Sequence, residues 1–194
     1  MSKELKKSLI ADVAFSCFLS SGYGGTSVDD IVRAAGISKG GLYWHFKSKE
    51  DIFLYLIGKW IKEYDQELLL RLAEEYPVRE KLKKFVDYYL ENVNVPIIAL
   101  IKEFLMQAKD VNILNELKSL IADSEKNNII KNVIMEAVRK GECKTVDVEA
   151  AAYAFMGMFE GIGMIWSVSH KDKQLLERTA RIALNIYLEG ILNK

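Results

Sequence analysis

The spacing of apolar side chains predicts α-helix along nearly the whole chain. Close to the N-terminus, apolar residues recur at intervals of three and four positions: Ile10, Val13, Ala14, Cys17 and Phe18. This spacing places them on one face of a helix. No segment shows the alternation of apolar and polar residues that is typical of a half-buried strand. The expected fold class is therefore all-α.

Two serines mark the starts of two short helices that are joined by a tight turn. Ser27 begins the first of them, and Asp30 stands three positions later, where it can complete a capping box. Gly36 supplies the turn, because glycine accepts backbone conformations that other residues avoid. Ser38 begins the second short helix, which is expected to bury Leu42. This order of elements predicts a helix-turn-helix.

Longer helices are predicted after residue 47, where we place the domain boundary. Their expected ranges are 48–76, 77–91, 96–109, 112–140, 145–169 and 173–192, with Thr145 as a cap and a break at His170 to Asp172. Residues 1–47 would then form a three-helix domain that contains the helix-turn-helix. Residues 48–194 would form a six-helix domain for effector binding and dimerisation.

Composition narrows the functional classes. The chain has 194 residues, half of them hydrophobic, with 27 basic and 27 acidic side chains. A protein that coats nucleic acid without specificity is usually strongly basic, so any DNA contact here must be a small local patch. Half of the residues being hydrophobic allows a sizeable core.

The compartment is expected to be the cytoplasm. Cys17 and Cys143 form neither a disulfide framework nor a metal-binding pattern, and the N-terminus lacks the long apolar run of a signal peptide. The apolar stretch from Ala150 to Val168 is interrupted by Glu160 and three glycines. We therefore expect a buried helix there and not a membrane span.

The start of the second short helix carries groups suited to DNA. The Ser38 hydroxyl can reach a phosphate, and Lys39 can reach a phosphate or a guanine edge. Gly40 and Gly41 follow, although glycine inside a helix costs about 1 kcal/mol relative to alanine. We interpret them as allowing close approach of the backbone to DNA. Crowding against the first helix is the alternative.

Three aromatic side chains follow in a row: Tyr43, Trp44 and His45. They cannot all be buried on so short a helix, and each can donate to a phosphate oxygen. Thr26 and Lys49 stand at the starts of neighbouring helices, where anions are favoured. His45 taken alone would more often be a surface or packing residue, but within this cluster we expect phosphate contact.

Residues Ile10 to Phe53 resemble the DNA-binding domain of the TetR/AcrR family of transcriptional regulators. The matching landmarks are Ala14, Phe18, Gly22-Tyr23, Thr26-Ser27, Ile31, Ala35-Gly36-Ile37-Ser38-Lys39-Gly40, Leu42-Tyr43, His45-Phe46 and Lys47-Ser48-Lys49-Glu50. The chain departs from the pattern at Gly41, where family members often carry a hydroxyl or amide residue. That removes one potential base-reading side chain.

The resemblance implies a homodimer of nine-helix subunits that binds a palindromic double-stranded operator and is released by a small-molecule effector. The positions that match the family's DNA contacts are Thr26, Ser38, Lys39, Gly40, Gly41, Tyr43, Trp44, His45 and Lys49. Two recognition helices would lie about 34–36 Å apart.

In the family the last two helices form the dimer interface. Gly157, Gly161 and Gly163 would let the first of those helices approach a partner closely, and the last helix is expected to bury an apolar stripe made of Leu175, Leu176, Ile182, Ala183 and Ile186. The alternative, that both helices only complete the core of a monomer, is less favoured because a monomer would bind a single half-site.

The middle helices are rich in aromatic residues. The candidate ligand-binding residues are Trp60, Tyr64, Tyr88, Phe104, Gln107, Phe155, Phe159 and Glu160. Such residues are more often core than cavity, but buried Tyr and Trp need polar partners and ligand pockets are built this way. Glu160, with Glu103 and Gln107, could orient a polar or cationic end of an apolar ligand. A structural or interface hydrogen bond of Glu160 is the alternative.

The leading hypothesis is a ligand-responsive repressor that uses no cofactor. A second hypothesis, an enzyme, lacks support because no nucleophile–base pair or metal-ligand spacing is visible in the sequence. A third is a DNA-binding adaptor or activator controlled by a protein partner and not by a small ligand.

Overall fold

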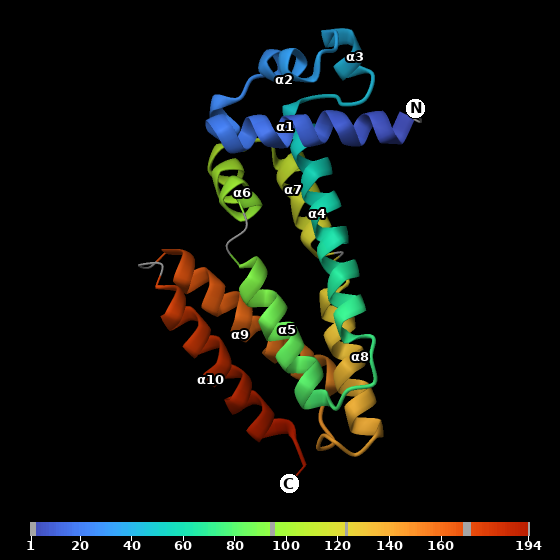
Figure 1. Cartoon of the computed structure of the whole chain (residues 1–194), viewed down its shortest axis with the longest axis vertical. Helices are drawn as coiled ribbons and strands as arrows, with labels where there is room; N and C mark the ends of the chain where they lie inside the picture. Colours follow the sequence, from blue (N-terminus) through green and yellow to red (C-terminus); the bar gives the residue numbers. More distant parts are fainter. Residues whose placement is uncertain (1–2, 94–95, 123, 169–171, 194) are drawn as a thin grey trace. The chain divides into compact units, whose positions relative to one another are not determined.

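The structure is a computed structural model that describes residues 3–93, 96–122, 124–168 and 172–193 (Figure 1). Within these ranges the chain forms helices and no β-strand, which confirms the all-α class. The helices are α1 (Lys3–Gly25), α2 (Val28–Ala35), α3 (Lys39–Tyr43), α4 (Lys49–Leu72), α5 (Val78–Asn92), α6 (Pro96–Gln107), α7 (Val111–Ala122), α8 (Lys126–Arg139), α9 (Val148–Val168) and α10 (Lys173–Ile191).

The chain divides into two compact units, and each is described separately below. Unit 1 comprises Met1–Glu63 and Val95–Ser124, and unit 2 comprises Tyr64–Asn94 and Glu125–Lys194. Unit 1 therefore contains more than the expected helix-turn-helix domain, because the first half of α4 and helices α6 and α7 share its core. The functional boundary at residue 47 stays a prediction.

Unit 1 is built around an aromatic cluster. Phe18, Phe53 and Phe104 are fully buried, and the rings of Phe53 and Phe104 stack with centroids 4.8 Å apart. Leu42 of α3 is buried in the same core, as the sequence predicts, and Phe46 is buried beside it. The short helices α2 and α3 lie along α1 and are held in place by this packing (Figure 1).

Unit 2 is a bundle of α5, α8, α9 and α10 together with the second half of α4. Its centre is a second aromatic cluster in which Phe155 lies between Phe85, Phe159 and Tyr187, with ring centroids 4.9–5.1 Å from its own. The Tyr187 hydroxyl donates to the Ala151 carbonyl at 2.8 Å, which ties α10 to α9.

The helix predicted over 112–140 is in fact two helices, α7 and α8, so the described residues form ten helices and not nine. The break occurs near Ser124, which is buried. The Glu125 N–H donates to the Asp65 carboxylate at 2.7 Å, so a side chain of α4 holds the start of α8. Apolar periodicity continues on both sides of this point, and neither Pro nor Gly marks it, which is why the sequence pattern concealed it.

Two other helix ends differ from the prediction. Helix α4 ends at Leu72 and not near Tyr76. Helix α9 begins at Val148, where the Asp147 carboxylate accepts from the N–H groups of Glu149 and Ala150 at 3.1 Å each, so Asp147 and not Thr145 supplies the cap. Most of the break predicted at residues 170–172 lies outside the described residues.

Helix α9 is long and apolar enough, by composition alone, to cross a membrane over Val148–Trp166. Only part of it is buried within the chain, however. Phe155 and Phe159 face the core, whereas Tyr153, Met164 and Ile165 are 60–72% exposed. The expectation of a buried helix is therefore met on one face only, and the other face is apolar and open.

Candidate nucleic-acid interface

The predicted capping box holds α2 in place. The Ser27 hydroxyl accepts from the Asp30 N–H at 3.1 Å, and the Asp30 carboxylate accepts from the Ser27 N–H at 3.0 Å. The hydrogen bonds from Ser27 lower the pKa of Asp30, so the carboxylate stays ionised. Gly36 then turns the chain with a φ of 62°, in the left-handed region that glycine tolerates. These local interactions fix the direction of α3.

Helix α3 is short and begins at a strong cap. The Ser38 hydroxyl oxygen accepts from the Gly41 N–H at 3.0 Å, which leaves its proton free for an external acceptor. The helix has five residues. Lys39 points back to α2 and pairs with Asp29 at 2.9 Å, and both side chains are more than half exposed. An exposed pair of this kind is weak and exchanges readily for a phosphate.

The structure distinguishes the two explanations for the glycine pair. A Cβ added at Gly40 would meet no atom within 4 Å, and one at Gly41 would meet only its own capping residue, Ser38, at 3.3 Å, and Ile37 at 3.9 Å. Neither glycine is required by crowding against α1. Close approach to an external partner remains the interpretation.

The aromatic residues after α3 divide into exposed and half-buried. Trp44 is 73% exposed and Tyr43 is 48% exposed, so both are available to a partner. His45 is half-buried, and its Nδ1 is buried without a hydrogen-bond partner among the described residues. Only its other ring nitrogen is a candidate for phosphate contact.

Thr26 and Lys49 both form hydrogen bonds within the chain. Thr26 is 2% exposed, and its hydroxyl donates to the Gly22 carbonyl at 2.8 Å. The expected donation of this hydroxyl to phosphate is therefore wrong for this conformation. The Lys49 ammonium donates to the carbonyls of Tyr23 and Thr26 at 2.9 Å each and lies 4.3 Å from the Tyr23 ring centroid. One of its three protons is left for a phosphate.

Sequence reasoning assigned Glu103 and Gln107 to a ligand site, but in the structure they serve another purpose. The Glu103 carboxylate of α6 accepts from the N–H groups of Tyr23 and Gly24, at 2.9 Å each. These hydrogen bonds lower the pKa of Glu103. Gln107 donates to the same carboxylate at 3.2 Å. Together they bind the last turn of α1, which no local sequence signal indicates because the partners lie about 80 positions apart.

The remaining predicted ligand residues are divided between the two units. Phe104 is buried and Trp60 half-buried in unit 1. In unit 2, Tyr64 and Tyr88 pack ring to ring at 4.6 Å, and the Tyr88 hydroxyl donates to the Tyr64 carbonyl. In this structure these aromatic residues are thus packed against other parts of the protein, and their role in ligand binding stays a prediction.

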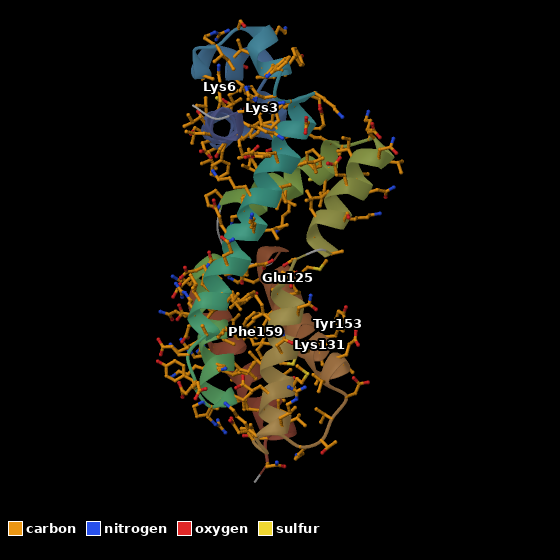
Figure 2. The ribbon with its side chains drawn as sticks, turned by 90° about the vertical axis from the view of Figure 1, so that its right-hand side faces the viewer. Lys3, Lys6, Glu125, Lys131, Tyr153 and Phe159 are labelled. Carbon is orange, nitrogen blue, oxygen red and sulfur yellow. The ribbon has the colours of Figure 1, made fainter. Side chains whose placement is uncertain are left out.

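Glu160 is satisfied by a partner on the neighbouring helix. It is 60% exposed and forms an ion pair with Lys126 of α8. It lies in unit 2, whereas Glu103 and Gln107 lie in unit 1, so the three do not form one cluster within a unit. A shallow surface pocket lies nearby between α8 and α9, lined by Asn128, Lys131, Glu149, Ala152 and Tyr153 (Figure 2). None of the predicted ligand residues lines it.

Helices α9 and α10 run side by side (Figure 1). Both helices present apolar side chains to solvent. On α10, Leu175, Ile182 and Ile186 are 53–63% exposed, although the sequence pattern assigned them to the same stripe as the buried Leu176. They share one face because their spacing follows the helical repeat.

The three glycines of α9 have different surroundings. A Cβ at Gly157 or Gly161 would meet nothing within 4 Å, whereas one at Gly163 would lie 2.5 Å from the Tyr89 hydroxyl. Gly157 and Gly161 leave room on the outside of the subunit, and Gly163 is needed within it.

Comparison with known proteins decides the family. Residues 10–56 match the bacterial regulatory proteins of the tetR family, and residues 57–193 match the C-terminal region of QacR-like proteins. The chain belongs to the TetR family. The predicted function, a ligand-responsive DNA-binding transcriptional repressor, is confirmed at the level of this family.

Individual TetR-family relatives resemble the chain over most of its length. The fatty acid metabolism regulator protein of Bacillus subtilis is 23% identical and covers 99% of this chain and 98% of its own. The regulator QacR of Staphylococcus aureus is 31% identical over 57% of this chain and 59% of its own. A crystal structure of the regulator FadR from Bacillus subtilis in complex with stearoyl-CoA superposes with a TM-score of 0.74 at 20% identity, over 94% of this chain and 97% of that one. TetR-family regulators bind DNA operators, act as dimers and bind small-molecule effectors.

Proposed function

We propose that this TetR-family member is a homodimeric repressor that binds a palindromic operator and is released by an amphipathic effector. The observation that carries the DNA-binding part is the exposed surface at α3, where Ser38, Lys39, Tyr43 and Trp44 lie on either side of a glycine pair and Gly40 has open space beside it. Ser38, Tyr43 and Trp44 suit phosphates, and Lys39 suits a phosphate or a guanine edge.

The remaining predicted contacts take smaller parts in this proposal. Lys49 and His45 each have one donor position left for a phosphate. Thr26 positions the start of α2 through its internal hydrogen bonds: its hydroxyl donates to the Gly22 carbonyl and its N–H to the Tyr23 carbonyl. Base reading by side chains then depends mainly on Lys39. Specificity comes in addition from DNA shape and from the spacing of the two half-sites.

The second subunit is proposed to bind at α9 and α10. Exposed apolar side chains of this size and number on two adjacent helices are unfavourable in water unless a partner covers them. Gly157 and Gly161 leave space for a helix of the partner to come close. A twofold axis there would give two copies of α3, one for each half-site.

For the effector we propose a molecule with a long apolar part and a charged end, and a long-chain acyl-CoA is the first probe. The support comes from the relative that resembles the chain over its full length and is a fatty acid metabolism regulator. Within unit 2, the exposed ion pair of Lys126 and Glu160 offers charged groups for the polar end of such a ligand. The proposed compartment is the cytoplasm, where a bacterial chromosome is accessible.

A footprint on the DNA upstream of the protein's own coding sequence tests the proposal. We expect two protected half-sites about one helical turn apart at physiological salt, and loss of protection on addition of stearoyl-CoA. Protection that persists with stearoyl-CoA and with fatty acids would favour an adaptor controlled by a protein partner. Absence of any sequence-specific protection at physiological salt would overturn the DNA-binding proposal.

A further inference from the structure

The first two turns of α1 carry lysines beside the end of α3. The Lys3 ammonium lies 5.4 Å from the centroid of the Trp44 ring, and that of Lys7 lies 4.6 Å from the Tyr55 ring and 5.1 Å from the Phe46 ring. Cations over aromatic faces are attracted to them. These contacts hold the beginning of α1 against the segment that links α3 to α4.

The acidic side chains of this part of α1 point elsewhere. Glu4 accepts a hydrogen bond from the Tyr55 hydroxyl at 2.9 Å, and Asp12 pairs with Lys59 at 2.7 Å. Lys3 and Lys6 are both exposed and three positions apart, so they lie on one side of the helix (Figure 2). Among the described residues no acidic side chain forms an ion pair with either lysine.

This basic end of α1 continues the surface that α3 presents. Trp44 follows α3 directly and is 73% exposed, and Lys3 lies over its ring. When the first residues of a recognition helix enter the major groove, the far end of that helix comes near the sugar–phosphate backbone at the edge of the groove. A cation beside Trp44 would then stand next to that backbone.

We propose that Lys3 and Lys6 bind phosphates of the operator backbone beside each half-site, with Trp44 positioning the Lys3 ammonium. The occupant is double-stranded DNA, and the contact carries no base information. This inference rests on the proposed DNA-binding function. It adds two cations per subunit to a reading surface whose other phosphate donors are mostly neutral.

Salt dependence of binding measures these contacts. Each phosphate neutralised by a protein cation contributes about 0.9 to the slope of log affinity against log salt concentration. The Lys3→Gln/Lys6→Gln variant should therefore lower the slope by about 3–4 for a dimer on the footprinted duplex, while the preference for that duplex over a scrambled one is retained. Lys3→Arg/Lys6→Arg should keep the wild-type slope.

A matched control is available in the same unit. Lys62 of α4 and Lys118 of α7 are also exposed, and Lys62→Gln/Lys118→Gln removes the same charge from other helices. If the Lys3/Lys6 variant keeps the wild-type slope, or if the control lowers the slope equally, the inference is overturned while specific binding by the wild type still supports the repressor. If the wild type shows no specific binding, both proposals fail.

The role of Trp44 is tested by combining a substitution of Trp44 with one of Lys3. In a Trp44→Leu background, Lys3→Gln should reduce affinity by a smaller factor than in the wild type, because the ring that positions the ammonium is gone. Equal factors in the two backgrounds would show that Lys3 acts without Trp44 and would overturn that part of the inference.

Discussion

Gly40 illustrates how a single residue can be explained by something outside the chain. Its neighbours leave the position of a Cβ open, so intramolecular packing gives no reason for glycine there. Alanine would be the better choice for the stability of α3, by about 1 kcal/mol in a helix interior. A residue that lowers stability without an internal benefit indicates a constraint from a partner, and the partner that fits this helix is DNA.

Gly40→Ala should therefore separate stability from binding. We expect the free energy of unfolding to rise by up to about 1 kcal/mol, because alanine favours the helix. The affinity for the operator should fall, because the methyl group holds the backbone away from DNA. Urea denaturation and fluorescence anisotropy measure the two effects. Unchanged affinity for the operator would show that Gly40 is not needed for close approach of the backbone to DNA.

Glu103 is a residue whose removal should loosen the end of α1. Glu103→Ala leaves the N–H groups of Tyr23 and Gly24 without their acceptor. We expect a loss of about 1 kcal/mol of unfolding free energy, since the site is partly open to water. Amide exchange at these two positions should accelerate as well, and Lys102→Ala on the exposed side of α6 should change neither quantity.

The same carboxylate predicts a pH dependence. Because its pKa is lowered in the folded protein, its contribution is complete above the ordinary value of 4.5 and is lost as the pH falls through the lowered value. The stability difference between wild type and Glu103→Gln should thus shrink on acidification below pH 4.5. A difference that stays constant or grows in acid would contradict the assignment.

Residues with local roles were predictable and residues with distant partners were not. Ser27 and Asp30 bond to each other across three positions, and Gly36 needs only its own φ, so sequence alone identified them. Thr26 was assigned to phosphate because the N-terminus of a helix favours anions. The structure buries it, because its hydroxyl meets the end of α1. Glu103 enters the ligand hypothesis only as a companion of Glu160, because the sequence does not show that Tyr23 and Gly24 lie beside it.

At the scale of elements, the two faces of α9 have different surroundings. Gly163 lies against Tyr89, whose hydroxyl donates to the Phe159 carbonyl at 2.8 Å. Gly157 faces open space on the other side. The sequence groups these glycines together as interface residues, because spacing alone does not tell which face meets α5.

Alanine at the two positions should have opposite effects on the isolated subunit. Gly163→Ala displaces Tyr89 from its hydrogen bond, and we expect a net loss of about 1–2 kcal/mol of unfolding free energy. Gly157→Ala should raise it by up to about 1 kcal/mol. Denaturation in urea under conditions that keep the protein monomeric compares them. If both variants change the unfolding free energy in the same direction, Tyr89 moves aside at Gly163→Ala without a loss of stability.

The break between α7 and α8 shows the limit of periodicity at this scale. Apolar positions continue through it, so the pattern predicts a single helix over 112–140. The break is maintained by Asp65 of another helix, which accepts from the Glu125 N–H. Periodicity therefore predicted that this segment is α-helical. It could not predict that the segment is divided into two helices, because the division involves a hydrogen bond to a distant residue.

At the scale of the whole molecule, zero formal net charge and exposed apolar helices point to the same assembly. A neutral chain gains little from general attraction to DNA, so two reading helices must act together. The apolar residues that are free on α9 and α10 offer the means to join two chains. The sequence predicted the apolar stripe, and the structure shows which of its residues are exposed on the surface of the single chain.

Ile182→Glu/Ile186→Glu should convert the dimer to a monomer at micromolar concentration. Two carboxylates would have to be buried against a partner, which is strongly unfavourable, whereas in the single subunit both side chains are 59–63% exposed and their replacement is tolerated. Light scattering after size exclusion measures the mass, and operator affinity should fall more than tenfold. A dimer with unchanged affinity would move the interface elsewhere; Asn185→Glu on the same helix is the control.

If Lys39 contacts DNA as proposed, its ion pair with Asp29 affects how the protein searches DNA. Asp29 raises the pKa of Lys39 and offers its ammonium an anion when no phosphate is near. On arbitrary DNA, a phosphate would then only replace the Asp29 carboxylate as the partner of Lys39, and the net gain in binding free energy from this lysine would be small. A guanine edge offers two acceptors in fixed directions, which Asp29 does not reproduce. An acidic neighbour on α2 would thereby shorten residence on non-specific DNA more than on the operator.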